Sequence, residues 1–600
     1  MWSRVDDIDG PKDFIAAVRE DLENSKPFAG DKLDEFTAEW VANENAFSRD
    51  FVRNVDLALA AAGLLHDLGH PPFSHALENF FERNLSILVP GAHREQMRRK
   101  ANLKVGAQFH EVAGLHLVNS LDWNSVTGIS RELVTRILIG GPPDSWVAAL
   151  HEIVSGEVDV DRMDYVIRDA NRAGTEFGAV DATRLMQSIK LRALATDDMN
   201  RASAWRVGYE YRARSAIETF LTNRIRYYQW VLFHYRVVAA NKFLEEALEE
   251  LLEIERTSSP NANDTNISAR FAELRPNLAY FGGPDRHTYR LRPAIKGSGV
   301  QQVRDFDTVR TASEVDDGVI NVWMKEAARR ARAIRTSNTQ TVHRARLANF
   351  EALYGAIFFR EQNWVSLWED EADFVAVAES MKASLTSILE LAATSISEMI
   401  ASVDENSDEH GLLSLEALNL ANIQIQMEAD PGRGVNLLAK RLLYNVPNVE
   451  ADDEKKKGTQ LQPWEKAAAH PAAIIRKDAE RRLQASLAFK PLQPGATSVK
   501  WIVSYQSTVA VKEDSEAVAI FKGNKIGRIG QYSALGSGLN NLTSRYPCIF
   551  AFVVLPADTE RDLEVLRSNA RKHFVEEFPD WVRTEFMGVP TASFFAIDGL

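Results

Sequence analysis

The chain of 600 residues contains a single cysteine, Cys548, which excludes a disulfide framework and a metal cage built from cysteines. It contains no apolar run of the roughly 18 residues that a membrane-spanning helix requires. The acidic start MWSRVDDIDGPKDF lacks the apolar segment of a signal peptide. We therefore expect a cytoplasmic protein with no membrane partner.

An excess of positive charge is also missing. The 84 acidic residues outnumber the 70 lysines and arginines, and the net charge is -14 at pH 7. An acidic protein gains little long-range attraction for phosphate backbones, so we expect no strong binding to nucleic acid. Hydrophobic residues make up 45% of the chain, and this share is sufficient for a large core.

Helical periodicity dominates the sequence as far as about residue 446 and predicts a mainly α fold. The alanine-rich residues 51–65 predict a helix, and residues 209–255 predict one or two long helices. Four segments after residue 499 are rich in β-branched and aromatic residues, and an amphipathic helix follows the last of them. We therefore predict three regions, which are a helical core (1–255), a helical extension with insertions (256–460), and a linker with a small α+β domain (461–600).

The segment GLLHDLGHPPFSHALE, residues 63–78, gathers three histidines and an aspartate. His66 and Asp67 are adjacent at the end of the predicted helix, and His70 and His75 follow in a turn rich in glycine and proline. An imidazole and a carboxylate at one helix end can bind a single divalent cation of Mn, Fe, Zn, Co or Ni, and Mg less readily. The alternative interpretation is a helix-end pair without a metal.

A second segment, GEVDVDRMDYVIRDANRAG, spans residues 156–174, and its part DRMDYVIRDANRAG is predicted as a helix that stops at Gly174. Asp161, Arg162, Tyr165 and Asp169 follow one another at i, i+1, i+4 and i+8, which places them along one stripe of that helix. Such a stripe offers partners to a metal, a phosphate chain, a sugar and a hydroxyl. The alternative interpretation is a surface helix with internal ion pairs.

Together the two motifs HDLGHPPFSH and VDVDRMDYVIRD resemble those of the HD-domain deoxynucleoside triphosphate triphosphohydrolases, which include bacterial dGTPase-type enzymes and the vertebrate SAM- and HD-domain dNTPase. FHEVAGLHLV is similar to the family's segment with a His-Glu pair, and NRIRYYQWVLFHYR has its arginine followed ten residues later by a histidine. No SAM domain is visible. The resemblance implies an HD-domain helical core within residues 1–255.

The resemblance also implies which residues bind the divalent metal, whose identity could be Mn, Fe, Mg, Zn, Co or Ni. Carried over by position, the ligands are His66, Asp67 and Asp161. The family takes another histidine from an upstream helix, and this sequence has no histidine before His66. Three alternatives follow: the natural start lies upstream, a carboxylate or amide from residues 12–56 replaces the histidine, or the site binds nucleotide without hydrolysing it.

Histidines at three further positions match those that line the family's triphosphate cleft, namely His70, His75 and His110. Glu78 lies three residues after His75 and can orient that imidazole. The resemblance implies that water attacks the α-phosphorus and that the nucleoside 5'-oxygen leaves. That oxygen needs a proton, for which His75 and His110 are the candidate donors.

Four positions match the family's substrate contacts. Arg162 and Arg224 correspond to phosphate contacts, Tyr165 to the ring that packs against the deoxyribose, and Asp169 to the partner of the 3'-hydroxyl. The implied function is metal-dependent hydrolysis of deoxynucleoside triphosphates to deoxynucleoside and inorganic triphosphate. The resemblance also implies a homo-oligomer, between dimer and hexamer, and a nucleotide effector in some members.

Two other functions fit the same motifs. Another HD-type phosphohydrolase would need His66, Asp67 and Asp161 but not Tyr165 and Asp169. A non-catalytic nucleotide sensor would fit the missing upstream histidine.

Overall fold

The protein is mainly α-helical, as the sequence predicts, and 75% of the residues that its computed structural model describes lie in helices. The described residues are 10–24, 33–88, 109–121, 123, 128–141, 145–194, 204–257, 262–275, 316–337, 341–404, 408–443, 479–489, 492, 499–506, 518–523, 525–533, 546–556 and 562–587. Within these ranges no helix is long and apolar enough to cross a membrane. The stretch NVEADDEKKKGTQLQPWEK, residues 448–466, whose mixed charges predict a linker, lies outside the described residues.

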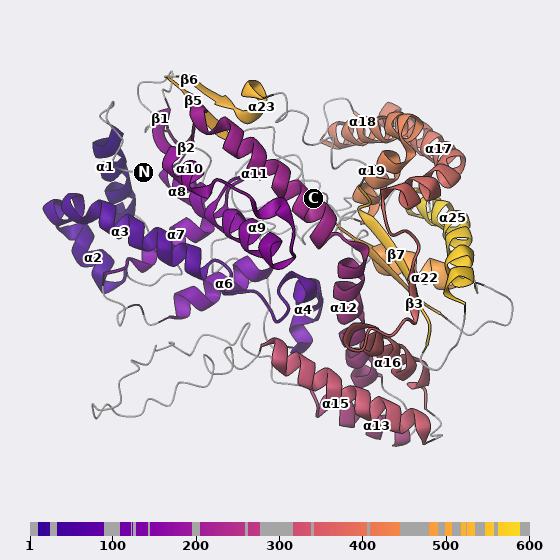
Figure 1. Ribbon diagram of the computed structural model, residues 1–600. Coiled ribbons are helices and arrows are strands. Elements are labelled where there is room, and N and C mark those ends of the chain that lie inside the picture. The colour runs from indigo at the N-terminus through magenta and orange to yellow at the C-terminus, as the bar shows by residue number, and fades with distance from the viewer. Residues whose placement is uncertain are drawn as a thin grey trace, which may run out of the picture. The chain divides into compact units, whose positions relative to one another are not determined.

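The chain forms two compact units, and Figure 1 shows their elements. The first unit consists of Met1–Tyr228, Pro276–Ile320 and Ala510–Asn540. Its α-helices are α1 (Gly10–Asn24), α2 (Glu35–Ala42), α3 (Glu44–Leu65), α4 (His75–Leu88), α6 (Phe109–Ser120), α7 (Arg131–Ile139), α8 (Trp146–Ser155), α9 (Val160–Arg172), α10 (Ala182–Ser188), α11 (Arg214–Tyr227), the short α23 (Ile529–Tyr532) and the first turn of α15 (Asp317–Thr336).

Helix α3 is longer than the sequence predicts, because it begins at Glu44 rather than at Phe51. The Asn43 side chain accepts a hydrogen bond from the backbone N–H of Ala46 and so caps the helix. The buried face of α3 contributes to an aromatic core in which Phe51 lies edge-on to Phe14. This packing fixes the direction of α3 and therefore the place where it ends, at His66.

The first unit also contains a four-stranded sheet of order β1-β2-β5-β6. Strand β1 (Ile189–Leu194) pairs antiparallel with β2 (Ala204–Glu210), and Tyr209 and Glu210 of β2 pair in parallel with β5 (Ala519–Lys522). Strand β6 (Lys525–Arg528) then pairs antiparallel with β5. Tyr209 and Glu210 are therefore not helical as predicted, and the helix of that segment starts at Arg214.

The second unit consists of Gln229–Arg275, Asn321–Val509 and Asn541–Leu600. Helix α15 (Asp317–Thr336) has its first turn in the first unit, and the remaining helices are α12 (Tyr235–Arg256), α13 (Ala262–Ala272), α16 (Arg344–Phe358), α17 (Glu371–Ser402), α18 (Asp408–Ala429), α19 (Pro431–Leu443), α22 (Ala479–Phe489) and α25 (Leu563–Met587). Strand β7 (Ile549–Val554) is central in a sheet and pairs antiparallel with β3 (Trp364–Ser366) and β4 (Lys500–Tyr505).

All four strands predicted after residue 499 form, but they contribute to two different sheets. β5 and β6 join β2 in the first unit, whereas β4 and β7 join β3 in the second unit. The β2–β5 and β3–β7 pairings join segments that are more than 100 residues apart in the sequence. Local sequence patterns identify strands, but they do not identify the partners of strands over such distances.

Candidate active site

The candidate site begins where α3 ends and the chain turns towards α4. Gly69 lies so close to α6 that a Cβ atom there would be 2.0 Å from the carbonyl oxygen of His110 and 2.2 Å from the backbone nitrogen of Gly114. No side chain fits between these backbones, so glycine is required at residue 69. The close approach brings the His66–His75 segment next to the N-terminus of α6, which carries His110.

The last part of the turn has an unusual backbone. Phe73 and Ser74 have φ values of 60° and 50°, in the left-handed region that side chains other than glycine rarely adopt. The backbone N–H of Phe73 donates a 2.7 Å hydrogen bond to the Asp317 carboxylate. Conformations of this kind are found most often at functional sites, where surrounding contacts maintain them. Here they immediately precede His75.

His66, Asp67 and Asp161 form the first group of side chains, which we call the metal trio. The Nε2 atom of His66 lies 3.2 Å from Oδ1 of Asp67 and 3.4 Å from Oδ1 of Asp161. On the other side of the ring, Nδ1 of His66 lies 2.7 Å from the carbonyl oxygen of Gly63, so the proton belongs on Nδ1. The lone pair of Nε2 is then directed at the two carboxylates.

The Nε2 atom of His66 is buried and has no hydrogen-bond partner among the described residues. The two carboxylates lie close to this nitrogen without a well-oriented hydrogen bond to it, and a cation between them would satisfy all three groups. Asp161, aided by Asp67 and opposed by burial, raises the pKa of His66 to about 9. The site therefore attracts positive charge, and the donor atoms suit a divalent transition metal.

The metal trio has three members in the part of the chain that the structure describes. No other histidine or carboxylate there joins it, and this includes the described carboxylates between residues 12 and 56. An amide ligand from that region, or a ligand from upstream of the chain, therefore stays a prediction.

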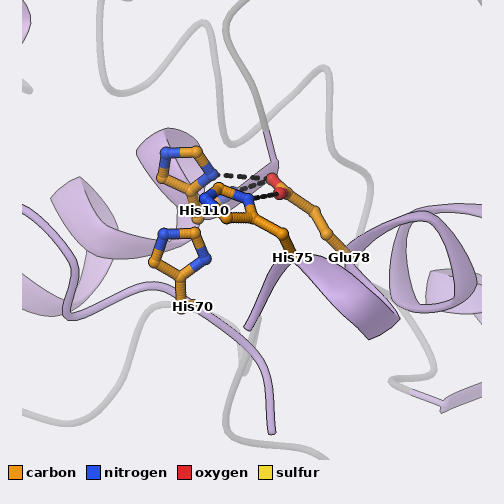
Figure 2. Close-up of side chains that lie close together, drawn as sticks. All are labelled: His70, His75, Glu78 and His110. Carbon is orange, nitrogen blue, oxygen red and sulfur yellow. Dashed lines mark hydrogen bonds and ion pairs between the residues drawn. The ribbon is translucent and has the colours of Figure 1, made fainter. Parts of the chain in front are cut away.

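His70, His75, Glu78 and His110 form a second group, the histidine cluster, which Figure 2 shows. Glu78 is buried, and its Oε1 accepts hydrogen bonds from Nδ1 of His110 at 2.7 Å and from the His110 backbone N–H at 3.1 Å. Its Oε2 accepts one from Nδ1 of His75 at 3.0 Å. Burial raises the pKa of Glu78, but the contacts with His110 and His75 outweigh it and hold the pKa far below its usual range.

The histidine cluster is less suited to a metal than the metal trio. The rings of His70 and His110 are stacked, with centroids 4.0 Å apart and planes 19° apart. The in-plane lone pairs of two parallel rings cannot converge on one cation in regular geometry. With Glu78 bound to the Nδ1 atoms of His75 and His110, the Nε2 atoms of both rings are available for proton transfer or for an anion.

The two groups meet at Asp67. Nε2 of His70 lies 3.3 Å from Oδ1 of Asp67, whose side chain is 56% exposed. Burial opposes ionisation of Asp67, but the neighbouring His70 and His66 lower its pKa below the usual range. Seven of the residues predicted from the sequence are therefore brought together from α3, the following turn, α4, α6 and α9.

Helix α9 forms as predicted and carries the four residues of the predicted stripe, with Asp161 in its first turn. The Asp159 carboxylate caps the helix by accepting a 2.6 Å hydrogen bond from the backbone N–H of Arg162, and burial raises the pKa of Asp159 to about 7. The Arg162 guanidinium lies 3.5 Å from the same carboxylate. Tyr165 and Asp169 follow one and two turns further along the helix.

Helix α11 contributes contacts that the sequence did not reveal. Nη1 of Arg224 forms a 2.6 Å ion pair with Glu157, and both side chains are buried. The Tyr227 hydroxyl donates to Asp169 at 3.2 Å, and the Tyr228 hydroxyl lies 3.3 Å from that of Tyr165. Glu157, Tyr227 and Tyr228 lie within quoted segments, but the sequence assigned them no role, and they are identified by their contacts with predicted residues.

No family model matches the chain. Similar curated proteins include an uncharacterized protein of Methanocaldococcus jannaschii, 29% identical over 198 residues that make up 32% of this chain and 34% of the relative. Uncharacterized proteins of Mycoplasma genitalium and Bacillus subtilis are 25% and 27% identical, over 32% and 30% of this chain and 41% and 33% of the relatives. The chain thus spans about a third to two fifths of the length of these relatives.

Two solved structures are similar to the chain. A phosphohydrolase from Bacteroides thetaiotaomicron is 17% identical, with 84% of this chain and 80% of that chain covered at a TM-score of 0.37. A hypothetical protein from Aquifex aeolicus is 16% identical, with 86% and 79% covered at a TM-score of 0.36. At these TM-scores neither likeness carries a functional argument, which must come from the geometry of the site.

Proposed function

We propose that the protein is a phosphoric ester hydrolase that uses a divalent metal to convert deoxynucleoside triphosphates to deoxynucleoside and inorganic triphosphate. The observation that carries this proposal is the convergence of the buried Nε2 of His66 with the carboxylates of Asp67 and Asp161, beside three imidazoles. Such residues can also form a structural network without a metal, but their nitrogen and oxygen donor atoms fit a divalent cation.

His66, Asp67 and Asp161 would hold the cation. When bound, a divalent cation supplies a water of lowered pKa and offsets charge on a phosphoryl oxygen. The reaction adds the water oxygen to the α-phosphorus and breaks the bond between that phosphorus and the nucleoside 5'-oxygen. The 5'-oxygen leaves with a proton, and triphosphate and deoxynucleoside are the products.

His75 is the strongest candidate for the donor of that proton. Its side chain is 70% exposed, and the Glu78 contact raises its pKa, so the protonated form is favoured. Glu78 holds Nδ1, which leaves Nε2 as the atom that can give the proton. His110 has the same connection to Glu78, but its side chain is 14% exposed.

The stripe on α9 would bind the rest of the nucleotide. Arg162 is partly exposed and offers N–H donors to the phosphates beside Asp161. Tyr165 would pack against the deoxyribose, and the Asp169 carboxylate would accept a hydrogen bond from the 3'-hydroxyl. Arg224 is bound to Glu157, so a phosphate would have to share it with that carboxylate.

The test is product analysis by phosphorus NMR after incubation of the metal-supplemented protein with a deoxynucleoside triphosphate. Release of inorganic triphosphate and deoxynucleoside is the expected result. Orthophosphate or pyrophosphate as the main product would refute the proposal. Equal turnover of the ribonucleotide would instead favour another HD-type phosphohydrolase.

One observation favours the second candidate, a nucleotide sensor without activity. The metal trio has no fourth histidine or carboxylate among the residues that the structure describes. Tight binding of a deoxynucleoside triphosphate without metal and without turnover is the result that this candidate predicts.

A further inference from the structure

The two tyrosines at the C-terminal end of α11 contact the two α9 residues that lie furthest from the metal trio on the stripe. Tyr227 is buried, and its hydroxyl donates to Oδ2 of Asp169 at 3.2 Å. The Tyr228 hydroxyl lies 3.3 Å from the Tyr165 hydroxyl. Tyr165 and Asp169 are four residues apart, about one helical turn along α9, so the adjacent tyrosines reach successive turns.

In a regular helix, adjacent side chains point about 100° apart, so two adjacent residues do not usually contact the same stripe of a neighbouring helix. At Tyr228 the α-helix α11 gives way to a π-helix, Tyr228–Leu232. Single π-helical turns are uncommon and are found frequently at functional sites. The change in helix type occurs at the point where both tyrosines face α9.

Tyr227 restrains the Asp169 carboxylate, and Tyr228 restrains the Tyr165 side chain. Asp169 has a 40% exposed side chain, and the hydrogen bond from Tyr227 holds its Oδ2. A ligand would share the other oxygen, Oδ1, with the exposed Arg168, whose Nε lies 3.6 Å away. Tyr228 contacts both Tyr165, through its hydroxyl, and Arg224, whose guanidinium carbon is 5.9 Å from the ring centroid. Arg224 is itself fixed by Glu157, so Tyr228 connects Tyr165 to a buried ion pair.

We propose that Tyr227 and Tyr228 are positioning residues, which set the preference of the site for the 3'-hydroxyl through Asp169 and against a 2'-hydroxyl through Tyr165. The inference rests on the proposed function for the roles of Asp169 and Tyr165. It adds that two residues outside the α9 stripe act separately on the two hydroxyl positions of the sugar, Tyr227 through Asp169 and Tyr228 through Tyr165. Neither tyrosine is proposed to touch the substrate.

The experiment measures the equilibrium binding of three ligands in the presence of Mn²⁺. These are a deoxynucleoside triphosphate, its 3'-deoxy analogue and the ribonucleotide. The samples are kept cold, and recovery of intact ligand checks that it has not been hydrolysed. Tyr227→Phe should reduce the preference for the 3'-hydroxyl by about tenfold and leave the preference against the 2'-hydroxyl unchanged, because a hydrogen bond to a charged group is lost. Tyr228→Phe should reduce the preference against the 2'-hydroxyl and leave the preference for the 3'-hydroxyl unchanged. Tyr211→Phe, whose hydroxyl contacts Arg214, is the matched control and should change neither.

A general loosening of the fold would move both preferences together in each variant, and that result overturns the inference. Wild-type protein that binds nucleotides without a 3'-hydroxyl preference overturns it as well. Wild-type protein with both preferences but without release of triphosphate leaves the positioning roles intact and refutes hydrolysis. The two proposals therefore fail separately.

Discussion

Two regions of the molecule gather ionisable side chains, and they differ in how completely those groups are paired. In the second unit, α12 buries Glu245, Glu246, Glu249 and Glu250, and Nζ of Lys500 lies 3.0 Å from Glu246 and 2.8 Å from Glu250. In the first unit, the active-site region leaves His66 Nε2 and His70 Nδ1 buried without a described hydrogen-bond partner.

The difference separates a structural network from a binding site. Charges that are buried and mutually paired stabilise one arrangement of helices and leave little for a ligand to satisfy. Buried polar atoms without partners, next to carboxylates and imidazoles with shifted pKa values, are typical of functional sites. The comparison predicts that substitutions in the two regions will have opposite consequences for activity and for stability.

The largest effect is expected for Asp67→Ala, which removes a predicted ligand from the metal trio. Triphosphate release should fall by more than about 100-fold, because even partners of metal ligands are worth about 10- to 100-fold. The melting temperature should change little, because the Asp67 side chain is 56% exposed. An active variant, or one that does not fold, would contradict the comparison.

Lys500→Met should have the opposite effect. It removes the buried cation that Glu246 and Glu250 share, although Glu250 keeps its 3.1 Å ion pair with Arg346, and this should lower the free energy of unfolding by about 3 kcal/mol. The activity per folded molecule should remain that of the wild type. Urea denaturation measures the change, and Lys525→Met, at an exposed position of β6, is the control that should be neutral.

A smaller effect is expected at the glycine that brings α6 to the active-site turn. Gly69→Ala should destabilise the protein by about 1–3 kcal/mol, because the added Cβ would collide with the backbone of His110 and Gly114. Activity should fall with it, since α6 carries His110. Gly63→Ala is the matched control in the same region, because its Cβ would meet no described atom within 4 Å.

That control should stabilise α3 slightly, by about 0.4–1 kcal/mol, since alanine restricts the unfolded chain more than glycine does. Thermal melts of the two variants would show shifts of opposite sign. Equal destabilisation of both would contradict the close approach at Gly69.

The smallest effect concerns the dependence of stability on pH. The contacts of Glu78 with His110 and His75 lower its folded pKa below the ordinary 4.5. Its stabilisation is therefore present above about pH 4.5 and is lost as the pH falls through the folded pKa. Between about pH 5 and pH 3 the wild type should lose more stability than Glu78→Gln, by about 1 kcal/mol. Identical slopes for the two proteins would contradict the pairing.

The sequence was sufficient to predict the local features of the site. Periodicity identified α9 and its stripe, and the resemblance of the two motifs implied a group of His66, Asp67 and Asp161, whose ligand atoms do lie within 4.8 Å of one another. These predictions depend on residues near one another in the chain, or on a motif that is read as a unit.

Long-range contacts could not be predicted in the same way. The bond between Glu78 and His110 spans 32 residues, and the ion pair between Glu157 and Arg224 spans 67. Strand β1 was not predicted at all, because IKLRAL mixes charged and apolar residues. The expected oligomer, the nucleotide effector and the three-region division stay predictions.

The most direct test of the central claim is the metal content of purified protein after supplementation with Mn or Fe. The account predicts a single bound cation per chain in the wild type and in Glu78→Gln, and none in Asp67→Ala. A wild-type protein without bound cation would contradict the account. So would a cation that Asp67→Ala retains and Glu78→Gln loses, because the metal would then belong to the histidine cluster.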